Sequence, residues 1–367
     1  MKRTIFLKVI LLLIIFLTPL LTPFADFGYE QVKVLFFIFM ITLAGFIWIS
    51  LGKNLIKLTK IKIAGICFIL ALLVTSLTGL NSQVSILGTE PYYQGWILYV
   101  YLLLFALMIS SVKIKMEYWA AVLMGAAFLV ALFAIKDWVL LNFFHQDIPT
   151  YAGRVVSTFG QPNFYAGFLL LSLPFCWGRL GRWGILGVLG IIGGILVSGS
   201  RTAIILLPFL LLSLIIRKKK ILFLGFLIGL LIFLKFFSGL IYQEIIDPQK
   251  VGKMVMTNNF DNSVEKRYYF WPLLWKIIEE KPFLGYGLEN IYSAYAYYFE
   301  INKHILFELN PNQSSVMYRL RDLGINRSHN YALDLLLFSG ILGFLSWGFL
   351  VCLMIKKAKS RELLVGL

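Results

Sequence analysis

The sequence predicts an all-α protein, a polytopic bundle of about ten transmembrane helices with one long outward-facing loop before the last span. Three observations support this fold class. Of the 367 residues, 59% are hydrophobic and only 14% are charged, whereas a typical soluble domain has roughly 25% charged residues. The hydrophobic residues are gathered in runs close to the ~20 residues that a spanning helix needs. Lysine and arginine are concentrated in alternate connections, as expected for a multi-pass membrane protein.

Nine of the predicted spans lie before residue 242, and the tenth follows the long loop. The first follows Met1-Lys-Arg-Thr and has no small-residue cleavage site, so we interpret it as an uncleaved helix. The eighth is short and has Pro208 in its middle, where a helix kinks or tilts. The predicted spans are 5–22, 31–51, 61–80, 95–112, 118–137, 163–180, 183–200, 202–216, 221–241 and 331–353.

The basic residues give the predicted orientation. Alternate connections hold more than half of the 34 lysine and arginine residues but only two acidic ones, Glu117 and Glu362, so we place these connections and both termini in the cytoplasm. The opposite connections carry most of the acidic residues and face outward. Membrane topology therefore accounts for the net charge of +16, and no nucleic-acid partner is expected.

The long outer loop is rich in aromatic residues. Within it, residues 264–281 can form a helix that lies in the membrane interface, with its tryptophans at headgroup depth. Pro282 would end this helix, and Gly285-Tyr-Gly287 would form a turn. The apolar face of the helix would carry Phe270, Trp271, Leu274, Trp275 and Ile278. The chain would then divide into a transmembrane bundle at 1–241, an extracytoplasmic loop at 242–330, and a final span with a cytoplasmic tail at 331–367.

Three arginines on the predicted outer face are candidate phosphate ligands. Arg201 lies in the turn between the seventh and eighth spans, where small neighbours such as Ser200 allow a bulky ligand to come close. Arg267 begins the loop helix, where a cation opposes the helix dipole unless an anion binds with it. Arg154 is a third possible ligand. Each could also be an ordinary interfacial arginine, but a planar guanidinium suits a diphosphate because it binds two oxygens at once.

His329 is the candidate general base. It directly precedes the last span, just above the membrane surface, and histidine is the usual general base near neutral pH. Asn330 can cap that span, and Asp334 can orient polar neighbours. The sequence contains no nucleotide fingerprint and no metal-ligand spacing, so neither a metal nor a cofactor is expected. Two arginines and a histidine at the outer face suit a lipid-linked diphosphate and a hydroxyl that must lose its proton, which suggests a membrane glycosyltransferase.

Four motifs follow one another around the long loop. They are Ser157-Thr-Phe-Gly-Gln-Pro-Asn-Phe-Tyr-Ala-Gly167; Ser198-Gly-Ser-Arg-Thr-Ala203; Arg267-x3-Trp271 with Lys281-Pro-Phe-Leu-Gly-Tyr-Gly287; and His329-Asn-Tyr-Ala-Leu-Asp-Leu335 followed by Gly340-Ile-Leu-Gly343. With these motifs the chain resembles the O-antigen ligase family of bacterial membrane proteins, which shares a region with Wzy-type polysaccharide polymerases.

The resemblance implies inverting, metal-independent transfer of a glycan from undecaprenyl diphosphate to an acceptor at the outer face of the bacterial cytoplasmic (inner) membrane. It implies that Arg201 and Arg267 hold the diphosphate and that His329 deprotonates the acceptor. The partners would be the lipid-linked glycan donor, a glycan, lipid-linked or protein acceptor, and membrane lipid. The expected substrate contacts are Arg154, Ser200, Trp271 and Asn330.

Two alternatives remain open at this stage. The acceptor can be a lipid-anchored sugar, a second lipid-linked glycan or a protein hydroxyl, so a polysaccharide polymerase or a protein O-oligosaccharyltransferase fits the same residues. A transporter of lipid-linked glycans would also use arginines near the lipid surface. A transporter is disfavoured because its charged sites usually lie near the midplane, whereas the predicted spans are almost free of charge.

Overall fold

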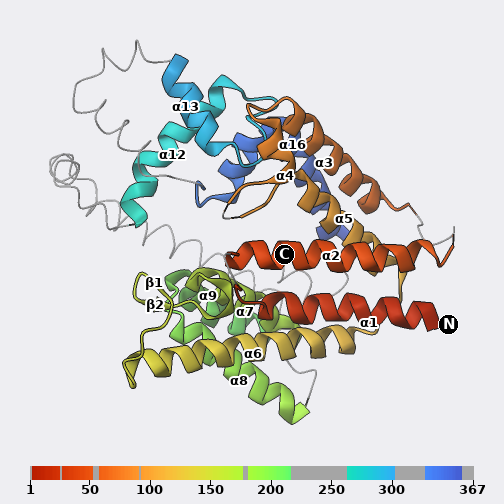
Figure 1. Ribbon diagram of the computed structural model, residues 1–367, viewed down its shortest axis with the longest axis vertical. Coiled ribbons are helices and arrows are strands. Elements are labelled where there is room, and N and C mark those ends of the chain that lie inside the picture. Colours follow the sequence, from red (N-terminus) through yellow and green to blue (C-terminus); the bar gives the residue numbers. More distant parts are fainter. Residues whose placement is uncertain are drawn as a thin grey trace.

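The computed structural model describes residues 2–24, 27–52, 58–90, 92–176, 181–215, 263–301 and 327–357. Within these ranges the protein is mostly helical (Figure 1), which confirms the predicted all-α class. The strands are β1 (Thr150–Tyr151) and β2 (Arg154–Val155), which pair antiparallel as a short hairpin. The predicted ninth span at 221–241 and much of the long loop lie outside the described residues.

Every predicted span within the described ranges coincides with an apolar helix. Among the described residues, five helices are long and apolar enough to cross a membrane, namely α1, α2, α3, α6 and α16, whereas α5, α7, α8 and α9 are apolar but shorter. The number of spans in the whole chain stays a prediction. The helix bounds are α1 Lys2–Leu17 with the 3-10 turn η1 Thr18–Leu20, α2 Tyr29–Ile49, α3 Lys60–Leu77, α4 Ser82–Leu87, α5 Trp96–Ser111, α6 Met116–Asn142, the 3-10 turn η2 Ser157–Phe159, α7 Pro162–Cys176, α8 Gly181–Val197, α9 Arg201–Ile215, α12 Ser263–Glu280, α13 Ile291–Ile301 and α16 Tyr331–Lys357.

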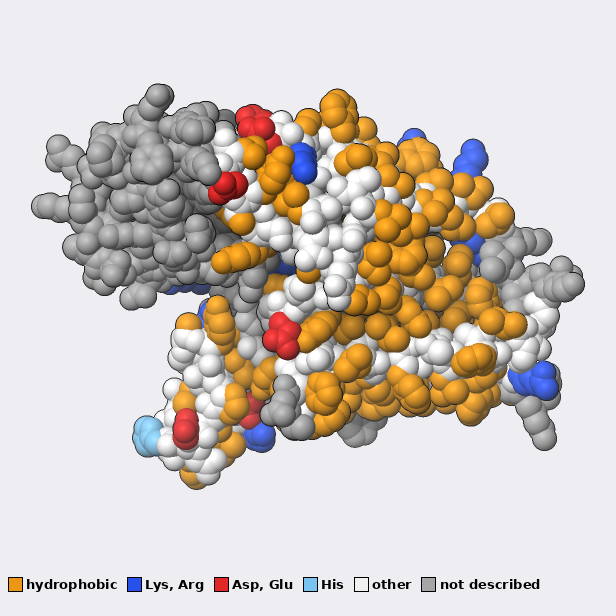
Figure 2. Space-filling view, turned by 45° about the horizontal axis from the view of Figure 1, so that its top comes forward, with side chains coloured by type: hydrophobic (Ala, Val, Ile, Leu, Met, Phe, Trp, Pro, Cys, Tyr) orange, Lys and Arg blue, Asp and Glu red, His pale blue; other side chains and the backbone are white. Residues whose placement is uncertain are grey.

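The helices pack around three apolar clusters. One cluster joins α1, α2 and α5, a second joins α6 to α9, and a third joins α3, α12, α13 and α16. Large apolar side chains also cover much of the outer surface, among them Phe39, Phe46 and Ile49 of α2. Figure 2 shows this broad hydrophobic face, far more continuous than a soluble monomer usually exposes. The protein is therefore a membrane protein.

Hydrogen bonds between helix ends define two ends of the bundle. Arg3 Nη1 donates to the carbonyl of Ser50 at 3.4 Å, which places the start of α1 beside the end of α2. At the opposite end, Lys33 Nζ donates to the carbonyl of Leu21 at 2.7 Å. We call these the N-terminal end and the far end. In Figure 2 the visible acidic side chains lie toward the left, and the right-hand edge, where α1 begins in Figure 1, carries lysine and arginine.

The last helix is broken in its middle. Gly340 has φ 56° and ψ −162°, a conformation that is essentially restricted to glycine. The turn at 282–287 inserts at this break and supplies the hydrogen bonds that the helix loses there. The backbone N–H groups of Tyr286 and Gly287 donate to the carbonyls of Leu337 and Phe338, and those of Ile341 and Leu342 donate to the carbonyls of Pro282 and Phe283, at 2.8–3.2 Å. Irregular backbone is tolerated at membrane depth only when it is satisfied in this way.

The predicted helix at 264–281 is α12, Ser263–Glu280, and Gly285 and Gly287 after it both have positive φ, as the predicted turn requires. Where α12 packs on α13 and α16, it buries Leu273, Leu274, Ile277 and Ile278. Trp271 and Trp275 of the predicted apolar face are 37% and 50% exposed. Their position at headgroup depth stays a prediction.

We predict that Gly340→Ala destabilises the protein by about 1–3 kcal/mol, because a side chain would strain this backbone conformation and collide with the backbone of Phe283. Gly348→Ala in the same helix is the matched control, since nothing lies within 4 Å of the added carbon. Thermal unfolding of the detergent-solubilised variants should show a lower Tm for Gly340→Ala only. Equal Tm values for the two variants would mean that the break is not required.

Candidate functional site

The structure brings Arg154 and Arg201 together at one turn between α8 and α9, which we call the arginine turn (Arg154 with Ser198–Arg201). Arg154 Nη1 donates to the carbonyl of Gly199 at 3.3 Å, and Gly199 has φ 59°. The backbone N–H of the buried Ser200 donates to Ser198 Oγ at 3.0 Å. Arg201 is exposed and is the first residue of α9. Arg154 therefore contacts the turn that leads into Arg201 at the N-terminus of α9, which is the positive end of that helix.

The segment that carries Arg154 is anchored by the first sequence motif. Ser157 Oγ donates to the carbonyl of Val130 at 2.9 Å, and Thr158 Oγ1 donates to the carbonyl of Pro19 at 2.7 Å. Lys33 Nζ donates to the carbonyl of Thr158 at 2.5 Å. These bonds fix the motif against η1, α2 and α6, so Ser157 and Thr158 hold the hairpin at 150–155 in place.

An anion would relieve an electrostatic imbalance at the arginine turn. Within the described ranges, neither Arg154 nor Arg201 pairs with a carboxylate. Like charges repel, and the exposed N-terminus of α9 adds partial positive charge from its unpaired N–H groups. Arginine side chains at a helix N-terminus form a typical phosphate-binding arrangement.

A second turn, residues 327–330, carries His329, and we call it the histidine turn. Its backbone is held at Ser328, which is fully buried. Trp271 Nε1 of α12 donates to the Ser328 carbonyl at 2.9 Å, and the Ser328 N–H donates to Asp334 Oδ1 at 2.9 Å. Asp334 therefore orients the turn, which is one of the roles that the sequence suggested for it.

His329 itself is exposed and has φ 56°, an uncommon conformation for a residue with a side chain. Asn330 confirms its predicted capping role, because its Oδ1 accepts from the backbone N–H groups of Ala332 and Leu333 at 3.1 and 3.4 Å. The histidine is thus presented by a turn that is fixed on both sides. Uncommon backbone conformations persist only where the surroundings hold them, and they are frequent at functional sites.

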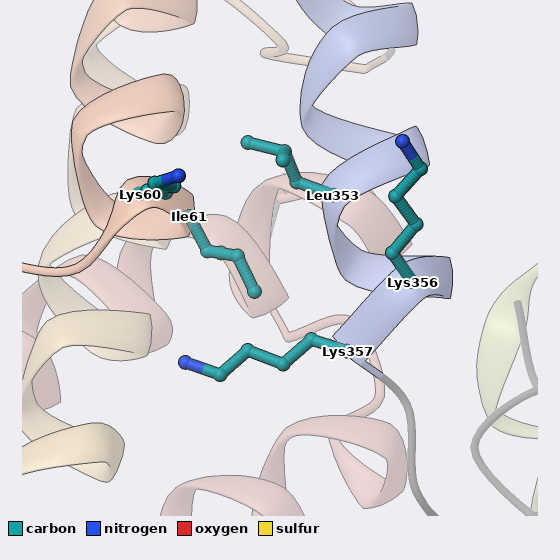
Figure 3. Close-up of a pocket in the computed structure, with 5 residues that line it drawn as sticks. All are labelled: Lys60, Ile61, Leu353, Lys356 and Lys357. Carbon is teal, nitrogen blue, oxygen red and sulfur yellow. The ribbon is translucent and has the colours of Figure 1, made fainter.

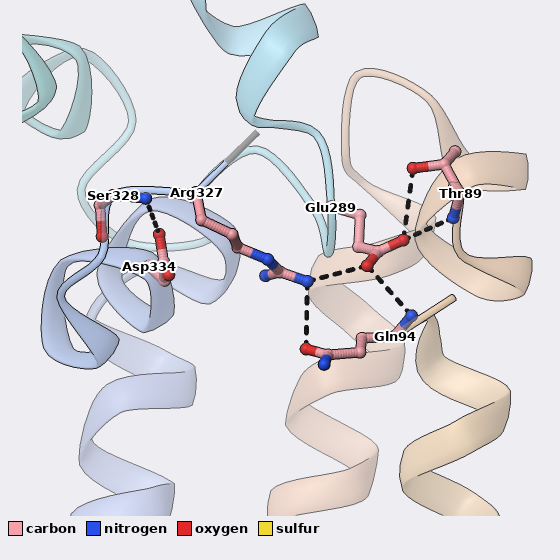
Figure 4. Close-up of polar contacts among 6 residues, drawn as sticks. All are labelled: Thr89, Gln94, Glu289, Arg327, Ser328 and Asp334. Atoms are coloured by element: carbon pink, nitrogen blue, oxygen red, sulfur yellow. Dashed lines mark hydrogen bonds and ion pairs between the residues drawn. The ribbon is translucent and has the colours of Figure 1, made fainter. Parts of the chain in front are cut away.

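The histidine turn is also held by an ion pair that sequence reasoning missed (Figure 4). Arg327 Nη2 lies 2.8 Å from Glu289 Oε1, and their side chains are only 15% and 4% exposed. Glu289 also accepts from the backbone N–H groups of Thr89 and Gln94, at 2.5 and 3.0 Å. Arg327 Nη2 donates in addition to Gln94 Oε1 at 3.0 Å. One carboxylate therefore joins the α4–α5 connection to the residue two positions before His329.

Aromatic rings complete the surroundings of Arg327. Its guanidinium carbon lies 4.8 Å from the ring centre of Tyr92 and 5.2 Å from that of Phe338. Burial raises the pKa of the Tyr92 phenol, while the nearby guanidinium acts in the opposite direction. Tyr92 therefore remains neutral near pH 7 and offers its ring face to the cation. The only sequence signal for Arg327 was its place directly before the Ser-His-Asn motif.

Arg267 differs from the prediction in its place along the helix. Since α12 begins at Ser263, Arg267 lies in its second turn and not at its start. The helix dipole acts mainly within the first turn, so its effect on Arg267 is weaker than the sequence suggested. The side chain of Arg267 lies outside the described part of the structure.

The arginine turn and the histidine turn both lie at the far end of the bundle, but in different packing clusters. The arginine turn belongs to the region of α6 to α9, and the histidine turn to that of α3, α12 and α16. The region of α3, α12 and α16 brings together Trp271, His329 and Asn330. The region of α6 to α9 brings together Arg154, Ser200 and Arg201.

Residues 186–348 match the protein-family model described as O-antigen ligase, which confirms the resemblance suggested by the motifs. The matched region contains Arg201, Arg267 and the whole histidine turn. No curated protein matches the chain.

We predict that Glu289→Ala and Arg327→Ala each lower the free energy of unfolding by about 3–5 kcal/mol, because each leaves a buried charge unpaired. The loss in free energy of unfolding should be smaller in the double variant than the sum of the losses in the two single variants. Thermal unfolding of all three variants in detergent measures these losses. Lys136→Ala is the control, since Lys136 forms an exposed ion pair with Asp137 and should change stability by less than about 0.5 kcal/mol. Strict additivity would contradict the assigned coupling.

Proposed function

We propose that this chain, whose residues 186–348 match the O-antigen ligase family model, transfers a glycan from an undecaprenyl-diphosphate carrier to an acceptor hydroxyl at the outer face of the cytoplasmic membrane. The observation that carries the proposal is the placement of the two turns. Both stand at the far end of the bundle, one with arginines at a helix N-terminus and the other with a histidine on a fixed backbone. Both reach into the region that matches the family.

The arginine turn would bind the diphosphate of the carrier. As the bond between the anomeric carbon and the diphosphate oxygen breaks, negative charge grows on the leaving oxygen. Guanidiniums fixed beforehand stabilise that charge without having to reorganise, which is commonly the largest catalytic contribution. Arg201 is the main ligand in this proposal, with Arg154 beside it and Arg267 supplied from α12.

His329 would act as the general base. The acceptor hydroxyl gives its proton to the imidazole as its oxygen attacks the anomeric carbon from the face opposite the diphosphate. One bond forms and one breaks in the same step, so the anomeric configuration inverts. A base must be held within hydrogen-bond reach of the proton that it removes. The bonds at Ser328 and the ion pair of Arg327 would serve that purpose.

The remaining predicted contacts take more specific roles in this proposal. Ser200 is buried and bonded within its own turn, so it positions Arg201 rather than contacting substrate. Trp271 donates its indole N–H to Ser328 and is still partly exposed, so its ring can pack on a sugar while it holds the histidine turn. Asn330 caps α16 and thereby fixes the residue after His329.

We predict that His329→Ala lowers the rate of transfer by about 10²–10⁴-fold, the usual contribution of a general base. The assay uses purified protein in liposomes with an undecaprenyl-diphosphate oligosaccharide, a chelator and separate acceptors (a lipid-anchored sugar, a second lipid-linked glycan and a peptide), with products identified by mass spectrometry. His145→Ala removes an exposed histidine in another loop and should leave transfer unchanged. Near wild-type transfer by His329→Ala would reject the general-base role.

We predict that Arg201→Lys keeps the charge but still reduces transfer markedly, because lysine lacks the planar fork that binds two phosphate oxygens. Arg201→Ala should reduce it further. The same liposomes measure both variants, and the acceptor that the wild-type protein uses distinguishes a ligase from a polymerase or a protein glycosyltransferase. Movement of the donor across the bilayer with no covalent change would instead indicate a transporter.

A further inference from the structure

A basic pocket lies between α3 and α16 at the N-terminal end of the bundle, opposite the two turns described above. Its volume is ≈ 310 Å³, and it is lined by Lys60, Ile61, Leu353, Lys356 and Lys357. Figure 3 shows the ammonium groups of Lys60 and Lys357 on the two sides of Ile61, with Leu353 reaching in from α16. Lys356 lies on the other side of α16 in this view.

Antiparallel packing creates this pocket. A Cβ added at Gly343 of α16 would lie 3.8 Å from Leu72 of α3, so the two helices meet near these residues. Lys60 lies twelve residues before Leu72, and Lys357 lies fourteen residues after Gly343. At a rise of about 1.5 Å per residue, both lysines reach nearly the same level, roughly 18–21 Å from the contact. The two helices therefore place positive charges opposite each other by construction.

The pocket has uncompensated positive charge. Across the described ranges of the chain, neither Lys60 nor Lys357 forms an ion pair or a hydrogen bond through its ammonium group. Lys60 is also the first residue of α3, where the helix dipole disfavours a cation. A bound anion would offset the repulsion between the lysines. It would also accept hydrogen bonds from backbone N–H groups at the N-terminus of α3, where the helix dipole favours negative charge.

The surroundings of the pocket favour an amphiphile over a free anion. Ile61 and Leu353 supply apolar lining between the lysines. On the surface next to it, four large apolar side chains are exposed, which would suit acyl chains packed along α3 and α16. They are Leu58, Ile63, Met354 and Ile355. Basic pockets between transmembrane helices commonly bind the headgroups of anionic lipids.

We propose that this pocket binds the phosphate headgroup of an anionic membrane lipid, with Lys60 and Lys357 contacting the phosphate and the acyl chains lying against the exposed apolar residues. The site is separate from the proposed transfer reaction. The lipid would fix the depth of α16 in the bilayer from one end, roughly 40 Å along the helix from the histidine turn at the other.

The test compares lipid binding by the wild-type protein, Lys60→Gln/Lys357→Gln and Lys113→Gln/Lys115→Gln. The second pair removes two exposed lysines from the α5–α6 connection and leaves the pocket intact. Native mass spectrometry of the detergent-solubilised protein, titrated with dioleoyl phosphatidylglycerol, gives the Kd. We expect a Kd at least about tenfold higher for the pocket variant only. Dioleoyl phosphatidylcholine should bind weakly to all three proteins.

Two further arms make the result decisive. Lys60→Arg/Lys357→Arg should restore binding, which separates loss of charge from loss of folding. Inorganic phosphate should not compete with the lipid at millimolar concentration, since it lacks the acyl chains. If the two glutamine variants lost affinity for the lipid equally, binding would reflect general attraction to surface charge, and the proposal would be overturned. Full competition by inorganic phosphate would show that the pocket binds a free anion and not a lipid.

Discussion

The insertion of the turn at 282–287 into the break of α16 is the contact on which the site depends. Four backbone hydrogen bonds pass between the two segments, and a fifth joins the N–H of Leu80, just beyond α3, to the carbonyl of Tyr286. This arrangement sets α12 and α13 on the end of α16. Trp271 then reaches Ser328, and Glu289 reaches Arg327. The histidine turn thus owes its position to a glycine nearly three helical turns further along the same helix.

The two turns at the far end follow a common physical plan. In each, the polar residues nearest the candidate functional side chain are used to hold backbone. Ser198 and Arg154 hold the turn before Arg201, and Ser328 and Asn330 hold the turn around His329. Because the backbone of each turn is already held by these hydrogen bonds, it loses little further entropy when a ligand binds. The residues that hold the backbone are thus distinct from the exposed Arg201 and His329, which remain able to meet a group carried by a membrane lipid.

Local pattern was sufficient to predict much of this structure. Long apolar runs located the helices, and Pro282 with Gly285 and Gly287 located the inserted turn. The break at Gly340 could not be predicted, because the residues around it are apolar apart from Ser339 and only its partner turn makes the break favourable. The pair of Glu289 with Arg327 was missed for a similar reason. Its members are 38 residues apart, and their shared partner Gln94 is far earlier in the chain. Tertiary contacts of this kind leave no periodic signal.

The bonding pattern of Glu289 has a consequence for sequence variation. Its carboxylate accepts from main-chain N–H groups at positions 89 and 94, and any residue except proline supplies those groups. Its charge, by contrast, is balanced by the side chain of Arg327. The Thr89 side chain adds only a longer bond, from its Oγ1 to Glu289 Oε2 at 3.3 Å. Related sequences should therefore tolerate other residues at position 89 but exclude proline at both main-chain donors. They should keep the residues at positions 289 and 327, or change both together.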